Sequence, residues 1–532
     1  MTSNRDHARA SVPDRIREAG GLSKGVAREV AKATGVAEAE VYGIGSFYHL
    51  LSRPGAKLRV CTGLSCAIAG AAEVLAHCEA QGLPVEATSC LAGCDRPPAV
   101  LKERVVLPAV STDDVLRAKG DWQALRSSSN PDADEWRGHV GPEGDLSQQV
   151  LQLAAEQAPL GSAFARAKEL GAAGILAEIE ASGLQGRGGA GFPAHIKWAG
   201  VQKQTETKRY VVLNADEGEP GTFKDREVML RRPDLILEGL AIAAHAIGAQ
   251  EIYLYLRGEF AGPWAVIERC IEAAHASKVY GDLRFHMHAG NGAYICGEET
   301  ALLEALEGKR GMPRLKPPFP VEVGLWGKPT LIHNVETIAY VPGILLQGSQ
   351  RFRSLGREEP GTKLYCISGH VQRPGTYELP LGVCLDELVA AAGGYLGTPK
   401  AFSPGGASSG FLPMEQRKLP LDFKSLAAVG SMLGSAGVVV LNDSVSMVSA
   451  VLDQLKFFED ESCGQCAPCR IGTRYLHESL KQMLAEGRSQ KPLAHVADAA
   501  WQMNEGSICG LGQAAPLPLT TALQYFPEEF QA

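Results

Sequence analysis

The chain has 532 residues, of which 45% are hydrophobic and 21% charged. This composition is typical of globular protein, and the length predicts roughly three to five domains. Its 60 acidic residues outnumber the 52 basic ones, and the resulting net charge of −8 argues against a nucleic-acid-binding protein. No stretch reaches the roughly 18 consecutive apolar residues of a membrane helix, and MTSNRDHARASVPDR contains no apolar signal segment. We therefore expect a cytoplasmic protein that binds neither nucleic acid nor membrane.

The first third of the chain predicts a helical segment followed by a small α/β domain. Apolar residues such as Val26 and Val30 recur at helical spacing within residues 1–50. The strand-like run KLRVC, an alanine-rich helical pattern and the short strands LPVEA, PAVLK and RVVLPAV then follow within residues 51–118. Residues 119–159 carry SSSNPDADE and GPEGD, which are typical of a linker.

The remaining chain predicts three further units, so the fold class is multidomain α/β. Between residues 160 and 347 the strand-like runs RYVVLNA, EIYLYLR and LRFHMHA alternate with helical stretches, which indicates a mostly parallel sheet covered by helices. Residues 348–430 are rich in strand and turn signals and contain one helix, so they indicate a small β-rich module. Residues 431–532 are mostly helical.

Cysteines carry most of the chemical information. A cytosolic chain does not keep structural disulfides, so clustered cysteines in it indicate metal or redox chemistry. Eight of the 13 cysteines form two clusters of four. We expect the other five to be small core residues: Cys78, Cys270, Cys296, Cys366 and Cys384.

The C-terminal cluster has the spacing of an iron–sulfur site. It consists of Cys463-x2-Cys466-x2-Cys469 with Cys509 downstream. Three closely spaced thiolates can wrap one face of a [4Fe–4S] cluster while a distant cysteine supplies the fourth ligand. Structural zinc sites usually show two cysteine pairs rather than a triplet and a singleton, so the spacing favours iron–sulfur over zinc.

The N-terminal cluster is less specific by itself. Cys61-x4-Cys66 and Cys90-x3-Cys94 each lie on a loop that leaves a predicted strand. Two thiolates from each loop would hold the two irons of a [2Fe–2S] cluster, but two cysteine pairs are also a zinc pattern.

A glycine-rich loop is a candidate phosphate site. Gly186-Arg187-Gly188-Gly-Ala-Gly191 matches G-x-G-x-x-G, but a helical pattern precedes it, whereas a dinucleotide fingerprint should follow a strand. Glycines still free backbone N–H groups to face an anion, and Arg187 and Lys197 would add positive charge. The alternative is an ordinary turn between two helices.

Two acidic segments point to the same region. VVLNADEGEPGT places four polar side chains directly after a buried-looking strand, where open parallel sheets bind ligands. GAYICGEETALLEALEG places a second set at a helix start, where carboxylates could bind a flavin or simply favour the helix dipole.

Five motifs in this order resemble one known family: GRGGAGFPAHIKW, NADEGEPGTFKDR, YICGEETALLEALEG, RLKPPFP and ESCGQCAPCRIGT. The chain resembles the NADH-oxidising flavoprotein subunit of respiratory complex I and its relatives. AEVYGIGSFYHLL and the first four cysteines resemble the thioredoxin-like [2Fe–2S] partner of that subunit, here fused to it. The resemblance covers nearly the whole chain. It implies an FMN- and NAD-binding α/β domain, a ubiquitin-like β-grasp module and a helical bundle with [4Fe–4S], and it favours [2Fe–2S] over zinc for the first cluster.

The resemblance also implies site residues. The [2Fe–2S] ligands would be Cys61, Cys66, Cys90 and Cys94, and the [4Fe–4S] ligands Cys463, Cys466, Cys469 and Cys509. FMN would contact Gly186, Arg187, Gly188, Lys197, Asn214, Asp216, Glu217, Tyr294, Gly297, Glu298, Glu299 and Asn334. NAD would contact Phe192, Glu219, Lys316 and Phe319, with Glu219 on the nicotinamide side. His333 stands where the family usually has asparagine, and the 23-residue gap between Cys66 and Cys90 is shorter than usual.

The fusion resembles diaphorase subunits of NAD-linked enzymes. Our leading hypothesis is the β subunit of an NAD-dependent formate dehydrogenase, which would receive single electrons through its clusters and pass hydride from FMN to NAD+. Its partner would be a catalytic α subunit with a molybdenum or tungsten pterin site and further iron–sulfur clusters. The alternatives are the diaphorase subunit of an NAD-reducing hydrogenase, a complex I subunit, and an electron-transfer subunit without nucleotide turnover.

Overall fold

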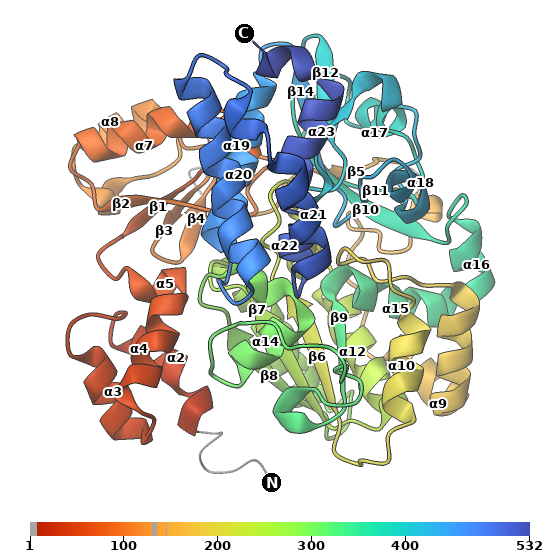
Figure 1. Ribbon diagram of the computed structural model, residues 1–532. Coiled ribbons are helices and arrows are strands. Elements are labelled where there is room, and N and C mark those ends of the chain that lie inside the picture. Colours follow the sequence, from red (N-terminus) through yellow and green to blue (C-terminus); the bar gives the residue numbers. More distant parts are fainter. Residues whose placement is uncertain (1–7, 130–135, 145, 532) are drawn as a thin grey trace.

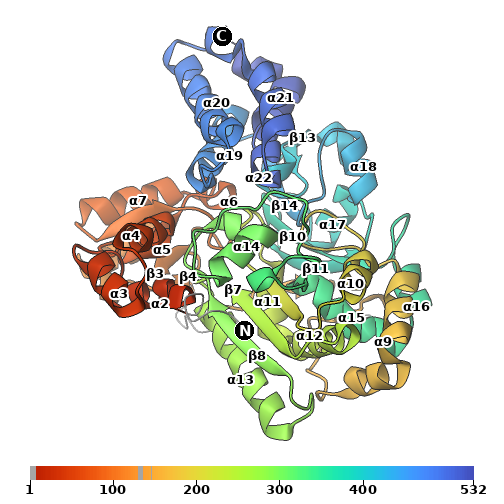
Figure 2. The same ribbon diagram turned by 60° about the horizontal axis from the view of Figure 1, so that its bottom comes forward.

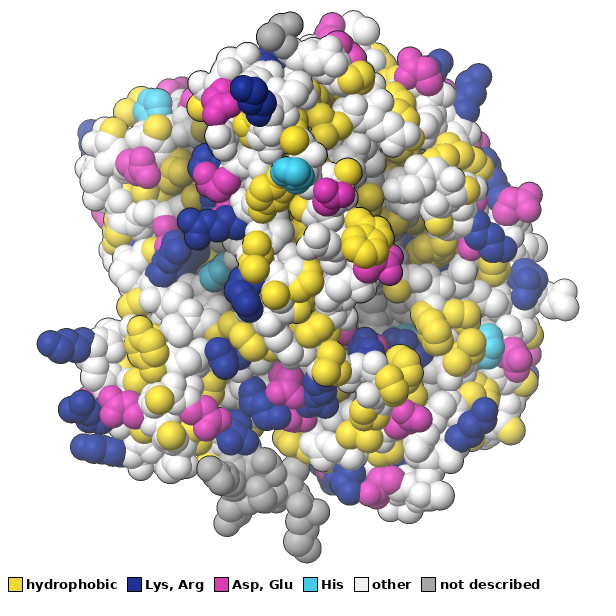
Figure 3. Space-filling view, in the orientation of Figure 1, with side chains coloured by type: hydrophobic (Ala, Val, Ile, Leu, Met, Phe, Trp, Pro, Cys, Tyr) yellow, Lys and Arg dark blue, Asp and Glu magenta, His cyan; other side chains and the backbone are white. Residues whose placement is uncertain are grey.

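The computed structural model of the protein describes residues 8–129, 136–144 and 146–531. Figure 1 shows the chain as a set of layered units, with the first helices at the lower left and the last helices running from the top of the view toward its centre. No helix in these residues is long and apolar enough to cross a membrane. On the face shown in Figure 3, side chains of both charge signs are interspersed rather than gathered into one field.

The first unit joins a helical segment to a thioredoxin-like sheet. Its sheet has the order β2-β1-β3-β4, with β1 and β2 parallel and the other neighbours antiparallel. Residues 1–7 of the predicted helical segment lie outside the described residues. The elements are α2 (Val12–Glu18), α3 (Val26–Thr34), α4 (Glu38–Phe47), α5 (His49–Ser52), β1 (Leu58–Cys61), α6 (Leu64–Ala67), α7 (Ala71–Ala80), β2 (Val85–Thr88), β3 (Val100–Lys102), β4 (Val105–Leu107) and α8 (Thr112–Ala118).

The segment predicted as a linker is packed in its described part. It contains η1 (Trp122–Ala124), β5 (Val140–Gly141) and η2 (Leu146–Gln148), and β5 pairs with a strand of the β-grasp sheet. The backbone N–H groups of Val150, Leu151 and Gln152 donate to the buried Glu378 carboxylate at 2.6, 3.0 and 2.9 Å. The segment is therefore not a free linker, because the Glu378 carboxylate, more than 200 residues away in the sequence, orders its backbone. Its turn-forming residues mark places where the chain changes direction.

The central unit contains a parallel sheet of four strands in the order β8-β7-β6-β9. The chain runs outward from β6 to β8 and then returns to place β9 on the other side of β6, so the strand order reverses between β6 and β9. The elements are α9 (Ser162–Ser182), α10 (Ala194–Gln202), β6 (Tyr210–Ala215), α11 (Lys224–Arg231), α12 (Pro233–Ile247), β7 (Glu251–Leu256), α13 (Ala261–Ser277), β8 (Arg284–Ala289), η3 (Tyr294–Gly297), α14 (Glu299–Leu306), η4 (Leu325–Gly327), β9 (Thr330–Asn334), α15 (Val335–Gln347) and α16 (Ser349–Ser354).

The last two units are the predicted β-rich module and the helical bundle. The module's sheet has the order β13-β12-β14-β10-β11-β5. Figure 2 shows α19, α20 and α21 side by side at the top of the view. The elements are β10 (Thr362–Gly369), β11 (Gly375–Pro380), α17 (Leu385–Ala391), β12 (Pro399–Ser403), η5 (Ala407–Ser409), β13 (Leu412–Pro413), η6 (Met414–Gln416), α18 (Phe423–Ala428), β14 (Gly437–Asn442), α19 (Met447–Glu461), α20 (Ala467–Ala485), η7 (Lys491–Leu493), α21 (Val496–Gly506), α22 (Gly510–Ala514), α23 (Leu517–Tyr525) and η8 (Pro527–Phe530).

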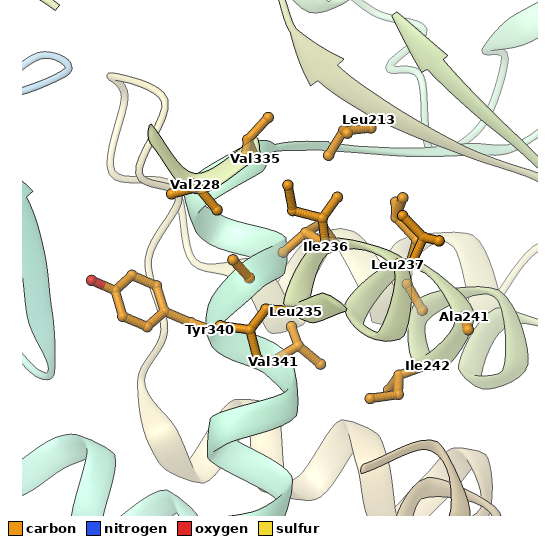
Figure 4. Close-up of a cluster of buried hydrophobic side chains, with 14 of the residues drawn as sticks. Leu213, Val228, Leu235, Ile236, Leu237, Ala241, Ile242, Val335, Tyr340 and Val341 are labelled. Carbon is orange, nitrogen blue, oxygen red and sulfur yellow. The ribbon is translucent and has the colours of Figure 1, made fainter. Parts of the chain in front are cut away.

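Packing of α12 against α15 forms the centre of the largest core (Figure 4). The sequence defines α12 clearly, with Pro233 at its first position and Gly248 in the left-handed conformation that ends it. Ile236, Leu237 and Val341 are all fully buried in this core. This core fixes α15 and therefore the end of β9, from which the helix starts.

Gly239 of α12 lies directly against the backbone of α15. A Cβ atom at Gly239 would lie 2.3 Å from the carbonyl oxygen of Ile338. Overpacking typically costs about 1–3 kcal/mol, whereas alanine gains about 1 kcal/mol over glycine within a helix. Because the added methyl group would meet a backbone oxygen, which cannot turn away as a side chain can, the cost should lie in the upper part of its range. We therefore expect Gly239→Ala to lower the free energy of unfolding by about 1–2 kcal/mol, measured by urea denaturation.

Gly43→Ala in α4 is the matched control, because no atom lies within 4 Å of the added methyl group. This change should leave the denaturation midpoint unchanged or raise it slightly. Equal stability of Gly239→Ala and the unmodified chain would contradict the close approach.

Candidate flavin, nucleotide and cluster sites

A cavity of about 630 Å³ opens where the strand order reverses. Asn214 at the end of β6 and Asn334 at the end of β9 lie opposite each other in the sheet register and both line this cavity. Ligands of open parallel sheets bind at such switch points, beyond the carboxyl ends of the strands. A second cavity of about 640 Å³ shares both asparagines and continues toward the helical bundle.

These two adjoining cavities collect the predicted FMN and NAD residues. The first is lined by Gly186, Gly188, Phe192, Lys197, Asn214, Gly297, Glu298, Glu299, Lys316, Phe319 and Asn334. The second is lined by Gly188, Asn214, Asp216, Glu217, Glu219, Tyr294, Gly297, Glu298 and Asn334. Residues from four of the five motifs, together with Asn334, thus face one continuous cleft.

Arg187 is the predicted FMN residue that lines neither cavity. Its guanidinium is fully buried, donates to the carbonyl oxygen of Pro360 at 2.9 Å and lies over the Tyr340 ring. Its backbone N–H donates to the Thr337 hydroxyl at 2.8 Å. The guanidinium therefore lies outside the walls of both cavities, and its Nε and Nη1 are buried without a hydrogen-bond partner in the described structure.

The glycine loop connects α9 to α10, and its glycines are required by close contacts. A Cβ atom at Gly188 would lie 3.0 Å from Cβ of Asn334. At Gly191, where φ is +63°, a Cβ atom would lie 2.8 Å from the Phe423 ring. The loop is a turn between helices, as the alternative interpretation held, and it also forms a wall of the cleft. It can therefore bring backbone against a bound group.

Two lysines and two glutamates form a charged side of the first cavity. Lys197 Nζ lies 2.8 Å from Glu299, and Lys316 Nζ lies 2.8 Å from Glu298 and 2.9 Å from Glu299. Burial raises the pKa of Glu299, but the two lysines outweigh it and bring the pKa down to about 2. This carboxylate is therefore ionised at neutral pH, and both lysine side chains are oriented before any ligand binds.

Phe192 and Phe319 provide apolar surface in the first cavity. Their side chains remain 46% and 50% exposed, although both are large aromatic residues. An exposed aromatic ring beside a cavity suits stacking against a planar ligand better than it suits core packing.

The acidic loop after β6 uses its carboxyl groups in different ways. Glu217 accepts from the N–H groups of Asp225 and Arg226 at 2.8 and 3.0 Å, and so caps α11. Burial, with a contribution from Asp225, raises the pKa of Glu217 to about 8. Asp216 keeps one buried carboxyl oxygen without a partner in the described structure, and burial raises its pKa well above the usual value. An unpaired polar atom on the cavity wall fits a ligand with several hydroxyl groups, such as the ribityl chain of a flavin.

Glu219 is held by two other parts of the chain. Tyr294 donates its hydroxyl to one carboxyl oxygen, and the Ser408 backbone N–H donates to the other at 2.8 Å. Burial raises the pKa of Glu219. Because Ser408 belongs to the β-grasp module, that module completes the cleft and fixes this side chain.

The structure adds Lys224 and Asp225, which the sequence analysis did not select. Lys224 is fully buried, lies 2.7 Å from Asp225 and 3.1 Å from Glu336, and lines the second cavity. Burial alone would lower the pKa of Lys224, but the surrounding carboxylates raise it. Asp225 in turn accepts from the Asn334 amide at 2.6 Å. The signal was available, because both residues follow directly in the motif NADEGEPGTFKDR.

His333 lines the first cavity as a neutral ring. Its Nε2 accepts from the indole N–H of Trp198 at 2.8 Å, which leaves the ring hydrogen on Nδ1. Burial, followed by the nearby charge of Lys197, lowers the pKa of His333 to about 3. The imidazole is therefore an uncharged polar group on the cavity wall.

The first cysteine cluster is assembled at the carboxyl ends of the parallel strands β1 and β2. Cys90 Sγ and Cys94 Sγ lie 3.6 Å apart, and Cys61 is in contact with both Cys66 and Cys90. All four side chains are buried. Four converging thiols are a suitable ligand set for two irons, and the short gap between Cys66 and Cys90 still accommodates α7 and β2.

The second cysteine cluster lies where three helices of the bundle begin or end. Cys466 precedes α20, Cys509 precedes α22, and Cys463 follows the end of α19. A Cβ atom at Gly512 would lie 2.8 Å from Cβ of Cys469, so glycine allows α22 to approach the triplet. Burial raises the pKa of Cys469 to about 12 and that of Cys509 to about 11, which favours the protonated thiols until a metal replaces the protons.

Four family descriptions match consecutive parts of the chain. The Nuo51 FMN-binding domain matches residues 179–343, and the NADH-ubiquinone oxidoreductase-F iron-sulfur binding region matches residues 449–532. The SLBB domain matches residues 364–412, and the thioredoxin-like [2Fe-2S] ferredoxin matches residues 14–118. These matches confirm iron–sulfur for both cysteine clusters, and the alternative of a zinc site at the first cluster is wrong.

Relatives and solved structures agree with these matches. The F 2 subunit of NADH-quinone oxidoreductase from Rhizobium meliloti (strain 1021) is 47% identical over 370 residues, which cover 67% of this chain and 88% of that protein. The corresponding protein of Rickettsia typhi (strain ATCC VR-144 / Wilmington) is 43% identical with the same coverage. A chain of the NAD+-reducing [NiFe]-hydrogenase in the air-oxidised state superimposes with a TM-score of 0.88 at 31% identity, over 98% of this chain and 93% of that chain. With its FMN-binding domain and two iron–sulfur domains, and with NAD as the nucleotide of its relatives, this chain belongs to the family of NADH-quinone oxidoreductase F subunits.

Proposed function

We propose that the protein exchanges electrons between NAD(H) and an iron–sulfur partner through FMN. The observation that carries this proposal is the continuity of the cleft. Its first cavity contains Phe192 and Phe319, and its second cavity reaches Gly510 and Leu511, directly beside Cys509. A nucleotide, a flavin and the [4Fe–4S] cluster would therefore lie in sequence along one path.

Different residues of the cleft would bind different parts of the nucleotide and the flavin. Phe192 and Phe319 would stack on the adenine, and Lys197 and Lys316 would neutralise phosphate oxygens at the cavity wall. The glycine loop, Asn214 and Asp216 would hold the flavin, and Glu219 would face the nicotinamide. Bound FMN supplies the conversion between hydride transfer and single-electron transfer, so no side chain needs to act as a general acid or base.

The relatives favour a different partner from our leading hypothesis. The named relatives are NADH-quinone oxidoreductase subunits and a chain of an NAD+-reducing hydrogenase, so they support the two alternatives and not formate dehydrogenase. We therefore propose that the chain is the NADH-oxidising subunit of a complex of the NADH-quinone oxidoreductase type. A hydrogenase diaphorase is the second candidate, because that structural match includes the fused thioredoxin-like domain.

Metal analysis of the complex purified with this chain separates the candidates. Stoichiometric nickel would support the hydrogenase partner, molybdenum or tungsten would restore the formate dehydrogenase hypothesis, and iron alone with NADH-dependent quinone reduction would support the leading proposal. Absence of NADH-driven ferricyanide reduction by the loaded chain would contradict all three.

Replacement of Lys197 tests the flavin and nucleotide assignment. Charged hydrogen bonds are typically worth about 1.5–3 kcal/mol, so Lys197→Ala should weaken FMN or NADH binding roughly tenfold to a hundredfold. The measurements are flavin content after purification and the KM for NADH with ferricyanide as acceptor. Lys203→Ala, an exposed residue at the end of the same helix, is the control and should behave as the unmodified chain. Full flavin content with an unchanged KM in Lys197→Ala would refute the assignment.

Replacement of Cys509 separates the cluster from the flavin. Cys509→Ala removes the distant ligand, so we expect loss of the [4Fe–4S] electron paramagnetic resonance (EPR) signal and of electron transfer to the partner. NADH-to-ferricyanide turnover should persist, because the flavin can still reduce a small acceptor. Cys270→Ala, outside both clusters, is the control for thiol loss. A folded Cys509→Ala variant, checked by circular dichroism, that retains full electron delivery would show that this ligand is not required.

A further inference from the structure

The loop that carries Cys90 and Cys94 is held mainly by the flavin domain. We call residues 89–95 the cluster loop. Arg257, at the end of β7, donates from Nη2 to the carbonyl oxygen of Cys90 at 2.8 Å. The Nη1 of the same guanidinium donates to the carbonyl oxygen of Glu217 in the flavin-binding acidic loop. One side chain thus connects a predicted cluster ligand to a predicted flavin contact.

Two further side chains fix the same loop. Arg226 of α11 forms a two-pronged ion pair with Asp95, at 2.8 and 3.1 Å, and donates to the carbonyl oxygen of Ala92. Glu461, the last residue of α19, accepts from the Ser89 hydroxyl with one oxygen and from the Tyr294 N–H with the other at 3.0 Å. The cluster loop, the flavin cleft and the [4Fe–4S] bundle are therefore tied together by charged side chains.

Water is largely excluded from this junction. Arg257 is only 7% exposed, and Arg226 is 1% exposed. A cavity whose lining includes Cys90, Asp216, Arg257, Tyr294 and Glu461 has a volume of about 20 Å³, room for about one water molecule. A charge acts more strongly in such surroundings than at a hydrated surface.

We propose that Arg257 is a positioning residue for the [2Fe–2S] cluster, which sets the cluster loop against the flavin cleft and stabilises the reduced cluster. Reduction adds one electron from the reductant to the cluster, and a cation bonded to a ligand residue favours the added negative charge. Hydrogen bonding, net charge and burial are the levers that set the potentials of such clusters. Glu259 pairs with Arg257 at 2.9 Å and keeps the guanidinium oriented, while the guanidinium itself contacts Cys90. The inference rests on the proposed [2Fe–2S] assignment.

The test is a redox titration of the full loaded chain with dithionite and mediators, followed by the EPR signal of the reduced [2Fe–2S] cluster. In Arg257→Gln, we expect at least a tenfold lower ratio of reduced to oxidised cluster at the wild-type midpoint, which corresponds to about 59 mV. Arg257→Lys keeps the charge and should recover at least half of this shift. Arg284→Gln, an exposed arginine of β8, is the matched control and should leave the midpoint unchanged.

A second variant is needed in case Arg257→Gln does not assemble the [2Fe–2S] cluster. If Arg257→Gln loses the cluster because Glu259 is left buried and unpaired, Glu259→Gln is titrated instead: it removes the carboxylate that offsets the Arg257 charge, so the midpoint should rise. A loaded Arg257→Gln or Glu259→Gln variant with the wild-type midpoint would overturn the inference. Because mediators replace NADH, the titration tests Arg257 even if NADH fails to reduce the unmodified chain, a result that would contradict only the proposed function.

Discussion

The reversal of strand order between β6 and β9 is the constraint on which the functional architecture depends. Connections leave β6 in one direction toward β7 and β8, while β9 returns on its other side, so the loops after β6 and β9 diverge and leave a gap beyond Asn214 and Asn334. The β-grasp module and the helical bundle complete the cavity that extends from that gap. The glycine loop covers it from one side, and Ser408 of the β-grasp module reaches its acidic loop from another.

Three charged side chains buried beside the cleft are each paired with a side chain of opposite charge. Lys224, Asp225 and Glu336 are buried together below the cleft, and each ion has an opposite charge within about hydrogen-bonding distance. Removing one partner of such a group is far more costly than losing a surface ion pair, because it leaves an isolated charge in a low-dielectric site. The network therefore restricts substitution around the cleft while leaving Asp216 with an unpaired oxygen for a ligand.

Short-range patterns were sufficient to predict the chemistry but not the contacts between domains. The spacing of Cys463, Cys466 and Cys469 and the order of the motifs indicated the clusters and the cleft, because those signals depend on nearby residues. Arg187 was expected to add charge to the cleft, yet its guanidinium lies outside the walls of both cavities and donates to Pro360. Likewise, Glu378 orders the backbone at Leu151, a contact with no local signal. Single-sequence periodicity describes which face of an element is apolar, but it does not identify a partner hundreds of residues away.

The contacts around Cys90 are also between domains, so a cysteine motif cannot predict them or their effect on the cluster. A cysteine pattern identifies ligands, whereas the environment of the ligands determines how readily the cluster accepts an electron. Here that environment is supplied from outside the thioredoxin-like domain: Arg226 and Arg257 come from the flavin domain and Glu461 from the helical bundle. When such a domain is a separate subunit, equivalent contacts must form across an interface and depend on assembly. In this chain they are intramolecular, so the position of the cluster relative to the cleft is established by folding itself.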